Sequence, residues 1–117
     1  MNRARLAIAI GLAVVFAVVF GILANQHHAA QNRTFDVTVR GGKSMSPLSL
    51  FAHQNDTITI NITSDTDGEV HLHVYDIAFD TKAGQTVSHT FKADKTCGCD
   101  IEWESTGTHL GDLTVSP

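Results

Sequence analysis

The sequence has few aromatic residues, only two cysteines and no cluster of positive charge. Its formal net charge is −4, and Lys and Arg nowhere form a run. This argues against nucleic-acid binding through phosphate contacts. Enzyme motifs are missing as well: there is no Gly-x-Ser-x-Gly, no His-Glu-x-x-His and no phosphate-cradling Gly-rich loop. We therefore predict that the protein is not an enzyme and has no nucleic acid partner.

One long apolar run lies near the N-terminus. Residues 6–24 read LAIAIGLAVVFAVVFGILA and contain no charged side chain. At 1.5 Å per residue such a helix spans about 28 Å, close to the roughly 30 Å of a bilayer's hydrocarbon core. Arg3 and Arg5 precede the run. The positive-inside tendency therefore predicts a cytoplasmic tail over residues 1–5, with the rest of the chain outside the cytoplasmic membrane.

A cleaved signal peptide is the alternative, but its apolar core is usually only about 7–15 residues long. The nearest small-residue cleavage site ends at Ala24 and has Ile22 two positions earlier, which fits poorly. We therefore expect a retained single-pass anchor in the cell membrane, with the C-terminal domain on the extracytoplasmic, periplasmic side. Residues 25–33 are short and polar, and we interpret them as a linker.

The rest of the chain, residues 34–117, has the pattern of an all-β domain. Short segments rich in Thr, Val and Ile alternate with Gly, Asp and Asn, and no stretch keeps a helical period. This predicts a two-sheet Greek-key sandwich of about seven or eight strands. The segments expected to be strands are 34–40, 47–51, 57–63, 69–76, 85–92, 99–104 and 110–116, with residues 77–83 as a connection.

The segment 69–76, EVHLHVYD, carries the most chemical information. Alternation places its aliphatic side chains on one face and His71, His73 and Tyr75 on the other. Imidazoles two residues apart on a strand lie roughly 7 Å apart, close enough to share one ion. A histidine pair in a strand is therefore the first candidate for a metal site.

The order and spacing of several segments point to a known family. NDTITINI at 55–62, EVHLHVYD at 69–76, TFKAD at 90–94 and GDLTV at 111–115 follow one another along the chain. This succession resembles the cupredoxin-like domains, in particular the small membrane-anchored ones of bacteria, over about residues 34–116. The resemblance implies a copper ion at one end of the sandwich, held by two His, one Cys and usually one Met.

The ligand pattern of that family is incomplete in this chain. On the resemblance, His71 matches the first His ligand and His109 falls on the axial Met position. Trp103 stands where the family has its thiolate, and no His follows in residues 105–108.

Imidazole and carboxylate groups without a thiolate suit Cu(II) or Zn(II) rather than a blue electron-transfer copper. We therefore predict a degenerate, non-blue site for a copper ion. Its expected ligands are His71, His109 and Glu104, with His73 as a further candidate. The parity of the last strand is expected to turn His109 inward. The alternative is that these histidines end strands and are satisfied by backbone carbonyls.

Cys97 and Cys99 are separated only by Gly98. In an oxidising compartment the plain expectation is an oxidised form, either a disulfide between the two cysteines or a bond between chains. The open alternatives are a Cu(I) or Zn site built from two thiolates, or free thiols. A looser alignment with the family would instead give Cys99 the thiolate position, with Glu104 and His109 after it.

Together these features predict a membrane-anchored extracytoplasmic protein that binds or relays a transition metal. The cytoplasmic membrane, through residues 6–24, is its first partner, and a redox or metal-transport membrane protein is its expected second partner. The alternative is a metal-free β-sandwich that acts as an interaction or accessory subunit of a membrane complex.

Overall fold

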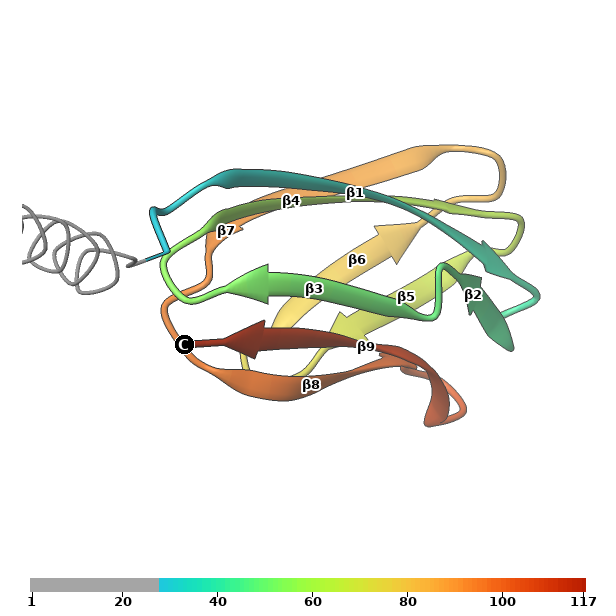
Figure 1. Ribbon diagram of the computed structural model, residues 1–117. Coiled ribbons are helices and arrows are strands. Elements are labelled where there is room, and N and C mark those ends of the chain that lie inside the picture. The colour runs from blue at the N-terminus through green and yellow to red at the C-terminus, as the bar shows by residue number, and fades with distance from the viewer. Residues whose placement is uncertain (1–27) are drawn as a thin grey trace, which may run out of the picture.

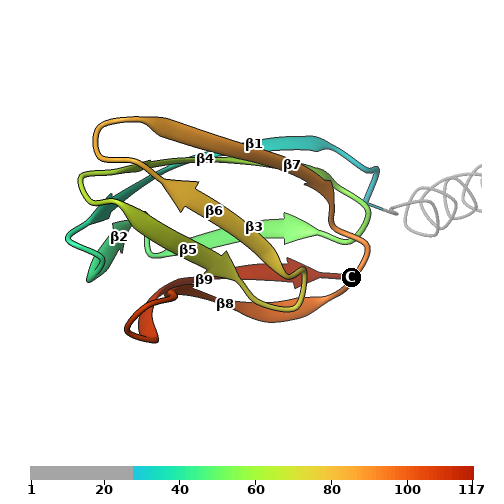
Figure 2. The same ribbon diagram turned by 180° about the vertical axis from the view of Figure 1, so that it is seen from behind.

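The structure, a computed structural model, describes residues 28–117. The predicted anchor, residues 6–24, lies outside the described residues. Within the described part, no helix is long and apolar enough to cross a membrane. Nine strands form two layers packed face to face (Figures 1 and 2), which confirms the all-β prediction.

The first sheet has four strands in the order β2-β1-β4-β7. β1 and β4 run parallel, whereas β7 runs antiparallel to β4. Ile58, Ile60 and Ile62 alternate along β4 and are all buried, as the period of two predicts for a strand with one face on the core. The bounds of these strands are β1 Asn32–Arg40, β2 Ser44–Ser46, β4 Thr57–Ser64 and β7 Thr86–Lys92.

The second sheet has five strands in the order β3-β9-β8-β5-β6. β8 turns Cys99, Ile101 and Trp103 into the core, as the alternation of the segment predicts. β3 lies two residues later than the strand expected over 47–51 and runs parallel to β9. The bounds of these strands are β3 Ser49–His53, β5 Gly68–Leu72, β6 Ile77–Thr81, β8 Cys97–Trp103 and β9 Thr108–Ser116.

The strand expected over 69–76 ends earlier than predicted. β5 stops at Leu72, and the chain turns and returns as β6. Val74 (φ 72°) and Asp76 (φ 52°) have left-handed backbone, which a strand cannot contain. The prediction that residues 77–83 form only a connection is also wrong, because Phe79 on β6 belongs to the buried core. β2 and β6 bring the number of strands in residues 28–117 to nine.

Trp103 closes the core at one end of the sandwich. Its side chain is buried between two glycines, and a Cβ added to Gly42 or Gly68 would lie 2.6 or 2.3 Å from the indole ring. Gly42 also has a φ of 61°, which other residues rarely adopt. The close approach of the ring therefore requires glycine at both positions.

Candidate metal centre

Imidazole and carboxylate groups gather on the outer face of β5 and β8. His71 on β5 is the cross-strand partner of Glu102 on β8, and the backbone N–H of His73 donates to the carbonyl of Asp100. Because neighbouring residues along a strand point to opposite faces, these side chains face away from the core that their neighbours fill. The antiparallel register of β5 and β8 is therefore what brings the imidazoles and carboxylates together.

Three of these residues lie close enough to bind one ion. His71, His73 and Glu102 each offer a ligand atom within 4.8 Å of the others. The two imidazole centroids are 4.5 Å apart, closer than on a continuous strand, because His73 lies beyond the end of β5 in the turn. Nε2 of His73 is 2.9 Å from Oε1 of Glu102. His71 lies between two further carboxylates, with Nε2 2.7 Å from Oδ1 of Asp76 and Nδ1 3.4 Å from Oε2 of Glu104.

Two ring nitrogens of this cluster are buried and have no hydrogen-bond partner. They are Nδ1 of His71, which lies 3.4 Å from the nearest carboxylate oxygen, and Nε2 of His73, which forms an ion-pair contact of 2.9 Å with Glu102 but lacks the alignment of a hydrogen bond. Buried polar atoms are normally hydrogen bonded, so such atoms need an explanation. If Nε2 of His71 donates its proton to Asp76, the lone pair of Nδ1 is left free, as a carboxylate–histidine–metal arrangement requires. Two imidazoles and one carboxylate fit Zn²⁺ or Cu²⁺.

The electrostatics of this face favour cations. The Glu102 carboxylate raises the pKa of His73 above its ordinary value of 6.5, while burial acts in the opposite direction. Asp100 and Glu104 also raise this pKa through their charge. With Asp76, four carboxylates surround the two imidazoles, and they attract a proton or a metal ion alike. Protons and metal therefore compete for the same ring nitrogens.

His109, a predicted ligand, lies outside the group of three. The β8–β9 ladder shifts register between Ile101 and Glu102, which leaves Leu110 as an extra residue in β9. Leu110 takes the buried position, whereas the side chain of His109 is 64% exposed. The prediction that His109 points inward is therefore wrong, and its Nδ1 pairs with Oδ1 of Asp100.

Glu102 is the member of the cluster that the sequence does not single out. Alternation in β8 places Glu102 on the face opposite to Ile101 and Trp103, which would make it part of a solvated face. The same parity would have identified it if the pairing of β5 with β8 had been known, because it then lies on the face of His71. Glu104, which was predicted, contacts His71 but does not belong to the group of three.

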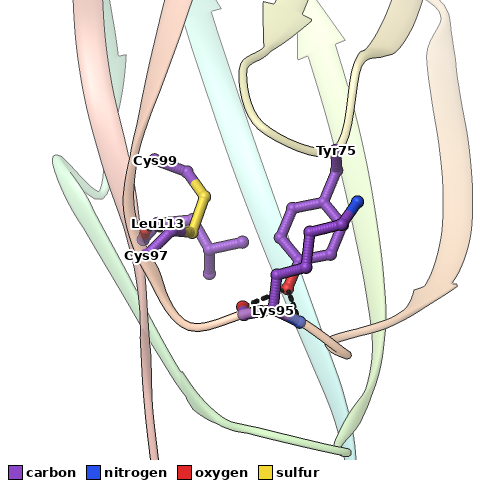
Figure 3. The surroundings of a disulfide bond; sticks show 5 residues. All are labelled: Tyr75, Lys95, Cys97, Cys99 and Leu113. Atoms are coloured by element: carbon purple, nitrogen blue, oxygen red, sulfur yellow. Dashed lines mark hydrogen bonds between the residues drawn. A yellow bond between two sulfur atoms is a disulfide. The ribbon is translucent and has the colours of Figure 1, made fainter.

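The two cysteines form a disulfide at the start of β8 (Figure 3). Neither has a free thiol in the described part of the chain, which contains both. Cys99 is fully buried and Cys97 is half-buried. Nearby, the Tyr75 hydroxyl donates to the carbonyl of Lys95 at 2.5 Å and accepts from its N–H at 3.1 Å, which ties the β5–β6 turn to the segment before β8. In this oxidised state no thiolate is available to a metal.

No protein-family model and no curated protein matches the sequence. Several solved structures are similar in fold. A copper binding protein in its apo form has a TM-score of 0.62 at 10% identity, covering 77% of this chain and 93% of that one. Auracyanin B has a TM-score of 0.58 at 15% identity, covering 79% and 93%. A chain of a heme-copper terminal oxidase dimer has a TM-score of 0.60 at 12% identity, covering 97% and 98%. The chain also matches the multicopper oxidase mgLAC, but spans only 39% of its length.

Proposed function

Because residues 32–116 form a cupredoxin-like domain, we propose that this protein binds a transition metal, with copper as the expected ion, on the outer face of β5 and β8. One observation carries the proposal: His71, His73 and Glu102 each offer a ligand atom within 4.8 Å of the others, and Nδ1 of His71 is buried without a hydrogen-bond partner. The likeness to an apo copper binding protein supports the choice of copper.

Each residue of the cluster has a distinct part in the proposal. His71, His73 and Glu102 would hold the ion, while Asp76 fixes the orientation and tautomer of the His71 ring. A copper ion bound there would supply one-electron redox capacity or be a cargo passed to another protein. Trp103 at the family's thiolate position and the oxidised cysteines favour a non-blue site without a thiolate.

The proposal includes a location. Residues 6–24 would anchor the chain in the cytoplasmic membrane and hold the domain at its extracytoplasmic surface, as the apolar run and its preceding arginines suggest. A redox or metal-transport protein of the same membrane is the kind of partner that this position would serve.

Copper retention by matched variants tests the proposal. The full chain is purified in detergent, loaded with Cu²⁺, dialysed and analysed for metal by mass spectrometry. We expect His71→Ala and Glu102→Gln each to lower the copper content by about one ion per chain. His89→Ala, which changes an exposed histidine outside the cluster, should leave the content unchanged. A His71→Ala protein that keeps the wild-type content would refute the site, and an intense blue thiolate band would refute its non-blue character.

One comparison favours a second candidate function, that of a metal-free accessory subunit of a membrane oxidase. The likeness to a chain of a heme-copper terminal oxidase dimer extends over 97% of this chain and 98% of that one. The two chains thus correspond in extent, unlike the match to mgLAC.

Purification from native membranes under mild detergent separates the two candidates. An accessory subunit should co-purify with a haem protein in a fixed ratio, visible in the absorption spectrum, and should hold no copper of its own. Copper bound in proportion to this chain, with no haem present, would exclude the accessory function.

A further inference from the structure

A second group of two imidazoles and one carboxylate lies at one end of the sandwich, where β3 ends. Trp103 lies at the other end of the sandwich. His28 belongs to the segment before β1, His53 ends β3, and Asp56 lies in the turn before β4. Each offers one ligand atom within 4.8 Å of the others. Figure 1 shows the end of β3 and the start of β4 beside the point where the chain enters the domain. This group therefore sits where the linker meets the sandwich.

The side chains of the group are closely packed. The rings of His28 and His53 stack with centroids 3.7 Å apart and an interplanar angle of 24°. Nε2 of His28 lies 3.6 Å from Oδ1 of Asp56. Nδ1 of His53 is buried and has no hydrogen-bond partner. In the described part of the chain, the buried side-chain nitrogen and oxygen atoms without a partner are this atom and the two ring nitrogens of the first cluster.

The carboxylate of Asp56 is fixed in place but has binding capacity left. It is fully buried, and it accepts the backbone N–H of Gln31 on Oδ1 at 2.8 Å and that of His53 on Oδ2 at 2.9 Å. A carboxylate offers about four lone-pair sites, so about two remain for another partner. A rigid carboxylate beside two imidazoles is a pre-arranged set of ligands for a borderline-soft cation.

We propose that His28, His53 and Asp56 bind a divalent transition-metal cation, Zn²⁺ or Cu²⁺, and that this ion fastens the linker to the domain. Three protein ligands leave one position of a tetrahedral zinc ion for water. The site shares no residue with the His71 cluster, so either can exist without the other.

Zinc titration of the full chain in detergent micelles tests the second site. The His71→Ala/His73→Ala double variant serves as the background, because any tight zinc binding that remains cannot come from the first cluster. By calorimetry we expect about one Zn²⁺ per chain in this background. Adding His28→Ala should lower the zinc affinity at least about tenfold, because mutating even a residue that only supports a metal ligand typically lowers metal affinity 10–100-fold. His89→Ala should change nothing. Absence of zinc binding in the background, or binding untouched by His28→Ala, overturns the proposal and leaves an ion pair between His28 and Asp56.

Hydrogen exchange gives an independent readout in the chain with both clusters intact. The N–H of Gln31 donates to Asp56 and its carbonyl accepts from Thr57, so it reports directly on the attachment of the linker. Zn²⁺ should slow exchange at Gln31, and should not do so in His28→Ala. Equal slowing in both proteins would show that zinc acts elsewhere and overturn the proposed role.

Discussion

Replacing Gly68 by alanine should destabilise the domain, because Trp103 leaves no room for a methyl group. The new Cβ would lie 2.3 Å from Cζ2 and 2.6 Å from Cη2 of the indole, whereas carbon atoms in contact prefer about 3.5–4.0 Å. The backbone at Gly42 also approaches the ring, since a Cβ there would lie 2.6 Å from Cε2 and Nε1, so the indole has little freedom to shift. Overpacking of this kind costs about 1–3 kcal/mol.

Thermal unfolding measures this cost. For a domain of this size, 1 kcal/mol shifts Tm by roughly 4–8 °C, so a mid-range cost of about 2 kcal/mol predicts a fall of about 8–16 °C. The chain has one Trp, so fluorescence reports unfolding around Trp103 itself. Gly98→Ala is the matched control, since nothing lies within 4 Å of the Cβ it would add. If the two variants melt together, the packing argument is wrong.

A double variant locates the strain. Trp103→Phe removes the outer ring of the indole, which holds the atoms that Gly68→Ala would clash with. In that background Gly68→Ala should cost less than in the wild type, with a coupling of about 0.5–3 kcal/mol between the two sites. Circular dichroism follows unfolding once the Trp is gone. An unchanged cost would mean that the strain comes from the backbone of β5 and not from the ring.

Three further outcomes follow from charge and cross-linking. The backbone N–H of His53 holds the pKa of Asp56 below its ordinary 3.8, against the effect of burial. The stability that this gives is present above pH 3.8 and is lost as the pH falls through the folded-state pKa. Asp56→Asn should therefore flatten this part of the acid unfolding transition, followed by circular dichroism. Glu102 raises the pKa of His73 above 6.5, so the stability that the protonated His73 contributes is complete below pH 6.5 and is lost as the pH rises through the folded-state pKa. In Glu102→Gln, NMR titration should show a lower pKa for His73. Reducing the disulfide should cost only about 1.6 kcal/mol, because its loop holds three residues, and denaturant unfolding with and without reductant measures this.

The sequence predicts those parts of the fold whose strands have one face on the core. In β4 and β8 the alternation of apolar and polar residues gives both the strand and its buried face. The hairpin of β5 and β6 escapes this reasoning, because the alternation runs on through the turn without a Gly or Pro to mark it. Val74 takes a left-handed φ there, which a β-branched residue rarely adopts and which no propensity predicts.

The candidate site is predictable only as far as local alternation extends. His71 and His73 lie within one segment, so the sequence alone places them together. Glu102 joins them through the pairing of β5 with β8, which depends on the tertiary fold. The prediction that His109 points inward is wrong for a related reason. The extra residue Leu110 shifts the register of β9 by one position, and such a shift turns each side chain to the other face of the strand.

The position of Trp103 bears on the kind of metal chemistry this fold could support. A packed indole between Gly42 and Gly68 leaves the end of the core closed. The proposed ligands instead lie on the outside of a sheet, where the side chains of His71 and His73 are 18% and 39% exposed. The two ring nitrogens are themselves buried, but the carboxylates of Asp76 and Glu104 beside them are exposed, so water and other ligands would reach a metal held there. Its surroundings would then reorganise when its charge changes. Fast electron transfer depends on a shielded site with fixed ligands, whereas uptake and release depend on an accessible one. If metal binds at this face, its geometry favours binding and transfer of the ion over electron transfer.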